Sequence, residues 1–83
     1  MSESVTVSGI VVRCRPEDRG PVRAALRALP WADTHQEDES GRLIVTIEAR
    51  DVDHSSERLL EIQSLPRVLS ADLAGYVIDD EPA

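Results

Sequence analysis

The stretch of sequence that decides the fold is GRLIVTIEA, residues 41–49. From Leu43 onward its side chains alternate: Leu43, Val45 and Ile47 lie on one side of the chain and the residues between them on the other. A two-residue period predicts a β-strand with two different faces. The Ser40-Gly41 pair just before it predicts a turn, so a preceding strand should run antiparallel to this one.

Working outward, the same pattern predicts four strands and two helices. The strands are expected at residues 5–15, 32–39, 43–49 and 68–77. A first helix is expected at residues 17–29, since its apolar side chains recur with helical spacing (Val22, Ala25, Leu26 and Leu29). A second helix should be capped by Asp53 or Ser55 and end before Pro66.

The order strand, helix, strand, strand, helix, strand is that of an α+β, ferredoxin-like fold with split βαβ units (βαββαβ). Right-handed connections would place the first and third strands at the centre of a four-stranded antiparallel sheet. Both helices would then cover one face and leave the other open. We expect a single domain over residues 1–83, with a short, disordered acidic tail at residues 79–83.

Alternation also predicts which side chains lie on each face of the sheet. The more apolar rows should meet the helices (Ile10, Val12, Cys14; Leu43, Val45, Ile47; Leu69, Ala71, Leu73). The rows left for the open face mix apolar and charged residues (Val7, Gly9, Val11, Arg13; Ile44, Thr46, Glu48; Asp72, Ala74, Tyr76). A mixed apolar patch with acidic margins on a small protein indicates a binding surface. Two alternatives are that the apolar residues are exposed without a function, as is common on protein surfaces, and that the open face packs in a dimer.

Composition narrows the classes of function. Nine basic residues, all arginine, against sixteen acidic ones give a formal net charge of −7, which disfavours nucleic acid as a partner. No stretch is apolar enough to span a membrane and no export signal is recognisable, so a cytoplasmic protein is expected. Cys14 is the only cysteine and should be a small buried apolar residue.

The sequence predicts neither an enzyme nor a metalloprotein. The two histidines, His35 and His54, lie on different predicted elements, and Cys14 has no second cysteine to complete a metal site. No pair of carboxylates can be placed at catalytic distance, and no glycine-rich anion loop follows the first strand. We therefore expect no cofactor and no bound metal. Trp31 is expected to pack over the end of the first helix.

Three segments carry a family resemblance: residues 8–13 (SGIVVR), 41–49 and 65–73 (LPRVLSADL). Together they resemble the NapD family, cytoplasmic chaperones for periplasmic nitrate reductase, over residues 7–76. The resemblance implies that the chain binds the twin-arginine signal peptide of the molybdenum-containing catalytic subunit. It also implies that the peptide is held in the cytoplasm until the cofactor is inserted, which prevents premature export.

For such a peptide, carboxylates would accept the arginine hydrogen bonds and apolar side chains would supply contact area. Glu48 and Asp72 are the candidates for the arginine pair, with residues 37–39 as a second acidic cluster. The remaining candidates share the expected open face (Val7, Gly9, Val11, Ile44, Thr46 and Tyr76).

Two other classes of function remain open at this stage. One is a small-molecule regulatory module of the ACT type, which has the same order of strands and helices. The charged segment at residues 15–18 and the late Gly20 fit such a module poorly. The other is a dimerisation domain that uses the open face, and a weak homodimer is compatible with signal-peptide binding. Thermal shifts with amino acids and a mass measurement in solution would separate these alternatives.

Overall fold

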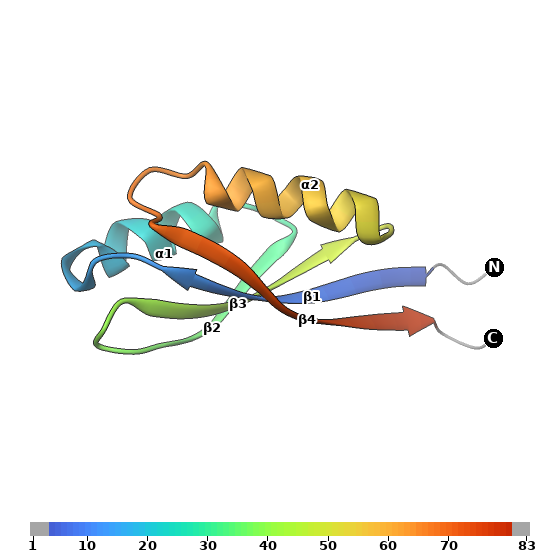
Figure 1. Cartoon of the computed structure of the whole chain (residues 1–83), viewed down its shortest axis with the longest axis horizontal. Coiled ribbons are helices and arrows are strands. Elements are labelled where there is room, and N and C mark those ends of the chain that lie inside the picture. Colours follow the sequence, from blue (N-terminus) through green and yellow to red (C-terminus); the bar gives the residue numbers. More distant parts are fainter. Residues whose placement is uncertain (1–3, 81–83) are drawn as a thin grey trace.

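In the computed structural model, which describes residues 4–80 and the side chains of residues 5–75, two helices lie on one side of a four-stranded sheet (Figure 1). The elements follow one another as β1 (Ser4–Arg13), the 3-10 turn η1 (Pro16–Asp18), α1 (Arg19–Arg27), β2 (Ala32–Glu37), β3 (Arg42–Ala49), α2 (Val52–Gln63) and β4 (Ser70–Asp80). The strands are antiparallel in the order β2-β3-β1-β4. The predicted ferredoxin-like architecture is therefore confirmed, with the first and third strands at its centre.

The helices begin at other positions than expected. The first starts as a 3-10 turn at Pro16 and becomes α-helical only at Arg19. Pro21 is tolerated in this first turn because the N–H that proline lacks would have had no partner within the helix. The cap of α2 is Asp51, whose carboxylate accepts a hydrogen bond from the backbone N–H of His54 at 2.8 Å. The expectation of Asp53 or Ser55 was wrong, and Ser55 is instead buried against Ser8, with 2.5 Å between the two hydroxyl oxygens.

The last strand also differs from the prediction. It begins at Ser70 and continues through Asp80, so residues 79 and 80 belong to β4 and not to a disordered tail. The rest of the expected tail, residues 81–83, lies outside the described residues. Because β4 pairs with β1 from Ser4 to Arg13, the two strands form a long antiparallel ribbon that runs beyond the helices toward both chain ends (Figure 1).

The core lies between the helices and the inner face of the sheet. It contains the predicted rows of β1 and β3, together with α1 and α2 residues (Ile10, Val12, Cys14, Leu43, Val45, Ile47, Val22, Leu26 and Ile62). Trp31 packs against this cluster, and the guanidinium of Arg58 lies 4.9 Å from the centre of its ring. On β4 only Ala71 of the predicted row is buried.

Leu69 and Leu73 were predicted to meet the helices. Leu73 does lie on the covered face, opposite Ile10 and beside α2, but both side chains remain exposed. Leu69 precedes the first residue of β4 and is 66% exposed, although its N–H still donates to the Arg13 carbonyl at 2.8 Å. Leu73 is 41% exposed and lies beside Ser56 and Leu59 of α2, at the edge of the helix layer. The helices therefore bury the inner rows of β1 and β3 where they lie over them, but on β4 they bury only Ala71 among the described side chains.

A β-bulge in β4 changes which residues share a face. Gly9 of β1 pairs with Gly75, but the next residue, Ile10, pairs with Leu73, so Ala74 is the additional residue. A bulge shifts the two-residue alternation by one position. In the backbone register Tyr76 pairs with Ser8. Its side chain, predicted to lie on the open face, is outside the described side chains.

Candidate functional site

The face of the sheet opposite the helices carries most of the predicted binding residues. We call this surface the open face and define it by its rows on the four strands (Val5, Val7, Gly9, Val11 and Arg13 of β1; Arg42, Ile44, Thr46 and Glu48 of β3; Asp33, His35 and Gln36 of β2; Asp72 and Gly75 of β4). The predicted residues Val7, Gly9, Val11, Ile44 and Thr46 lie there side by side and are partly exposed. Glu48 and Asp72 are exposed at its borders.

The centre of the open face is apolar, and at one level β1 and β4 carry no side chains that project from the sheet. Val11 pairs with Ile44, and Val7 lies two residues away from Val11 on the same row. Between the two valines, Gly9 faces Gly75 across the β1–β4 ladder, so neither strand carries a side chain at this level. A Cβ added at Gly75 would meet nothing within 4 Å, and one at Gly9 would make only ordinary contacts of 3.8–4.0 Å. Packing within the chain does not require glycine at either position, and glycines in strands often occur where a ligand approaches closely.

The two predicted arginine partners lie far apart. Glu48 pairs across the sheet with Val7, whereas Asp72 pairs with Val11 on the other side of β1. Four residues along a strand and two strand spacings separate them, which amounts to roughly 16 Å between their Cα atoms. Two consecutive arginines whose Cα atoms are 3.8 Å apart are not held together by such a pair. Each carboxylate can bind a guanidinium, but the two do not form one clamp.

A carboxylate that sequence reasoning missed lies much nearer to Glu48. Asp33 of β2 pairs with Thr46, two residues before Glu48, and its exposed side chain is on the open face. Diagonal neighbours of this kind have Cα atoms about 7–8 Å apart, within the span of one pair of arginine side chains. The signal was hidden because β2 has its own irregularity, between Thr34 and Gln36, and its alternation cannot be read directly.

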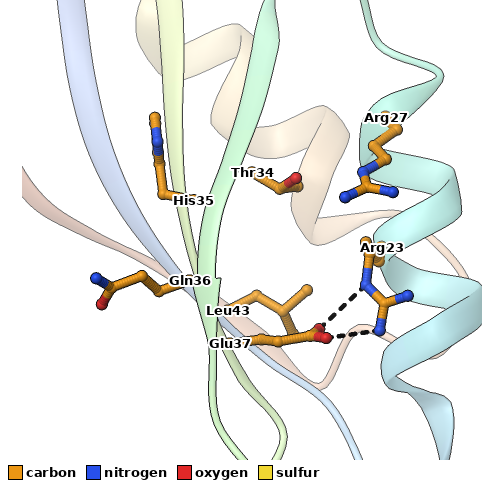
Figure 2. A pocket seen from close by; sticks show the side chains of 7 residues that line it. All are labelled: Arg23, Arg27, Thr34, His35, Gln36, Glu37 and Leu43. Carbon is orange, nitrogen blue, oxygen red and sulfur yellow. Dashed lines mark hydrogen bonds and ion pairs between the residues drawn. The ribbon is translucent and has the colours of Figure 1, made fainter.

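The side chains around Thr46 extend the polar border of the open face. His35, in the β2 irregularity, lies 2.7 Å from the Thr46 hydroxyl through its Nε2 atom. Figure 2 shows His35 and Gln36 on the side of β2 that faces away from α1, whereas Thr34 and Glu37 point toward the helix. The border of the open face along β2 is therefore formed by hydrogen-bonding groups.

The second predicted acidic cluster serves the fold. Glu37 accepts two hydrogen bonds from the Arg23 guanidinium, at 2.6 and 3.3 Å, and lines a cleft of about 100 Å³ between α1 and β2 (Figure 2). The carboxylate of Asp38 accepts from the Ser40 hydroxyl at 2.6 Å and forms an ion pair with Arg42 at 3.1 Å. These hydrogen bonds, the Ser40 one first, lower the pKa of Asp38 to about 2. Only Glu39, which is exposed in the same hairpin, remains from this cluster as a candidate.

The remaining groups with chemical potential are few. Burial raises the pKa of the Cys14 thiol, which favours its protonated, unreactive form. Among the described side chains, those of residues 5–75, no three His, Cys, Asp or Glu groups gather in a way that could hold a metal ion. No helix of the described chain has the length and apolar character needed to cross a membrane.

Comparisons with known proteins agree with this architecture. The family model described as NapD protein matches residues 5–78. The solution structure of the Tat proofreading chaperone protein NapD from E. coli is similar, with a TM-score of 0.82 and 26% sequence identity, covering 90% of this chain and 80% of that chain. No curated protein matches the sequence. Because the family model covers almost all of the described residues, the chain belongs to the NapD family.

Proposed function

We propose that this protein is a chaperone that binds the twin-arginine signal peptide of the catalytic subunit of periplasmic nitrate reductase. It holds the precursor in the cytoplasm until the molybdenum cofactor is inserted, and so prevents early export. Family membership and the similarity to the E. coli Tat proofreading chaperone support this role. The structural observation that carries it is the open face: an apolar centre without a covering element, bordered by carboxylates.

The open face has the chemistry that such a peptide needs. Val7, Val11 and Ile44 offer apolar area to the apolar segment of the peptide, which supplies most of the binding free energy. Exposed carboxylates accept the hydrogen bonds of arginine in a bidentate geometry, which lysine cannot reproduce. The net charge of −7 attracts a cationic segment and raises its association rate.

The mechanism is one of occupancy and involves no catalysis. A signal peptide bound to the open face is unavailable to the export machinery, and release of the peptide permits export. The peptide loses conformational freedom on binding, so its affinity is lower than the buried area alone suggests. This cost favours reversible binding, which a chaperone needs in order to hand over its client.

Calorimetric titration with a synthetic twin-arginine signal peptide tests the proposal. We expect saturable binding, which weakens at least about tenfold in the Ile44→Asp variant because an unpaired carboxylate would enter an apolar contact. Leu60→Asp is the matched control, since Leu60 is 61% exposed on α2, on the other side of the sheet. A peptide with both arginines changed to lysine should bind several-fold more weakly.

Three results would contradict the proposal. The first is no detectable binding at high micromolar peptide. The second is equal loss of binding in Ile44→Asp and Leu60→Asp, which would place the peptide elsewhere. The third is a folded dimer in which a second copy of the chain occupies the open face and cannot be displaced by the peptide.

A further inference from the structure

The open face has unequal charge at its two ends along the strands. At one end Asp33 and Glu48 are diagonal neighbours, and no arginine joins them among the described side chains of this face. Arg50, the next arginine along the chain from Glu48, directs its Nε toward His54 of α2, at 3.4 Å. Arg58 donates to the backbone carbonyl of Glu48 from the helix side and lies over the Trp31 ring. The acidic end therefore keeps two carboxylates available for an external cation.

The other end of the open face is basic but balanced. Arg13 and Arg42 pair directly across the β1–β3 ladder, an arrangement of like charges that is unfavourable without counter-charges. The guanidinium of Arg42 forms an ion pair with the Asp38 carboxylate at 3.1 Å, and Asp72 is the diagonal neighbour of Arg13 on β4. Both arginines at this end thus have a carboxylate as a neighbour, whereas Asp33 and Glu48 form no ion pair with any of the described side chains.

On the basis of the proposed function, we infer that the bound peptide lies along the strands with its arginines at the Asp33–Glu48 end. Its apolar segment then passes over Val7, Gly9 and Val11 toward Arg13 and Arg42. The reverse direction brings the peptide arginines against Arg13 and Arg42, and it places the apolar segment beside two carboxylates. Repulsion of this kind selects one binding direction as effectively as attraction does.

A helical peptide fits the open face in length, and its dipole favours the inferred direction. The open face from Val7 to Arg13 spans six residues of β1, roughly 20 Å, which matches a helix of about 13 residues. In a helical peptide the N-terminus carries partial positive charge and the C-terminus partial negative charge. For a peptide whose arginines precede its apolar segment, the same direction therefore sets the positive end of the helix at Asp33 and Glu48 and the negative end at Arg13 and Arg42. Gly9 and Gly75, which carry no side chains, let the middle of the helix approach the sheet closely.

Nitroxide labels on the peptide measure the direction in the intact protein. Two synthetic twin-arginine signal peptides carry the label at the N-terminus or the C-terminus, and broadening of the protein's backbone amide signals is recorded by NMR. We expect the N-terminal label to broaden the signals of Asp33 and Thr46–Glu48 most strongly. The C-terminal label should broaden those of Arg13, Arg42 and Ser70. The opposite pattern of broadening would overturn the inference. So would a result in which one label broadens signals of β2 and the other signals of β4, because the peptide would then lie across the strands.

Charge variants test the same point independently. Asp33→Asn and Glu48→Gln should each weaken binding about two- to fivefold, the range of an exposed ion pair. Asp72→Asn should weaken it less than either, and Glu61→Gln on α2 is the control with the same change of charge. The losses should disappear with a peptide whose arginines are replaced by glutamine, because the interaction then has no partner. A larger loss in Asp72→Asn would overturn the inferred direction while leaving peptide binding intact, whereas absence of any binding would overturn the proposed function as well.

Discussion

The two faces of this sheet are built by the same strands but differ in burial and in composition. On β3 the helix-side residues Leu43, Val45 and Ile47 are at most 1% exposed, while Ile44 and Thr46 between them remain partly exposed. An antiparallel sheet with one solvated face normally alternates apolar and polar residues cleanly. Here the solvated face keeps valine and isoleucine at its centre, which a fold alone does not need. The covered face therefore determines stability, and the open face is the surface that we propose for peptide binding.

Isoleucines three residues apart on β3 give the sharpest test of this comparison. Ile47→Ala should lower the free energy of unfolding by about 3–4 kcal/mol, since a fully buried isoleucine leaves a cavity in a small core. Ile44→Ala should cost about 1 kcal/mol or less, because its side chain is already partly in water. Urea denaturation followed by circular dichroism measures both values. Equal losses would mean that the open face contributes to the core as much as the covered one.

Two glycines sharpen the comparison at the level of the backbone. Gly41 has a φ of +98° in the β2–β3 turn, and a Cβ there would lie 2.0 Å from the Cys14 carbonyl oxygen. We expect Gly41→Ala to cost about 2–3 kcal/mol, since both the backbone conformation and the contact with a neighbouring strand end become strained. Gly75→Ala, on the open face, should leave stability within about 0.5 kcal/mol of the parent because nothing lies within 4 Å.

The same denaturation experiment checks the glycine pair, with peptide binding as a second measurement. A Gly75→Ala protein that is stable but binds the signal peptide less tightly would assign the centre of the open face, where β1 and β4 carry no side chains, to recognition. If Gly41→Ala is as stable as the parent protein, the turn must adopt another conformation, and the close approach of Gly41 to Cys14 is not needed for folding.

Much of this architecture could be predicted from the sequence because burial follows the two-residue period. The alternation of Leu43, Val45 and Ile47 predicted both the strand and its covered face, and the order of elements predicted the sheet. The alternation at the end of β4 could not be predicted in the same way, because one additional residue, Ala74, shifts the register between β4 and β1. An isolated glycine in a strand pattern, such as Gly75, is the one local signal of a bulge.

The candidate site was predicted less completely, because contacts between distant residues decide which charges are available. Glu37 and Asp38 read as a free acidic cluster, yet Arg23 of α1 and Ser40 of the turn bind their carboxylates. Asp33 was missed for the converse reason, since its place beside Glu48 depends on the register between β2 and β3. In a strand without a bulge, sequence alternation identifies the face on which a residue lies, but not the partner that neutralises its charge.

The smallest expected effect concerns the pKa of Asp38, a carboxylate that is bound within the chain, unlike those of Asp33 and Glu48 on the open face. Its pKa is lowered from 3.8 to about 2, first by the Ser40 hydroxyl and then by the backbone N–H of Arg42. A lowered pKa means that the folded state favours the carboxylate. This contribution to stability is therefore present above about pH 4 and is lost as the pH falls through about 2.

NMR titration of the Asp38 carboxyl carbon should show a midpoint near pH 2, and Ser40→Ala should raise it toward the ordinary value because the strongest hydrogen bond is removed. Adding the signal peptide at neutral pH should leave the chemical shift of this carbon nearly unchanged, while the carboxyl carbons of Asp33 and Glu48 respond. That contrast separates a carboxylate used by the fold from carboxylates available to a partner. If the Asp38 signal moves as much as that of Glu48, the peptide reaches the β2–β3 turn. Asp38 would then also contact the peptide, and the distinction between carboxylates bound within the chain and carboxylates available to a partner would be wrong.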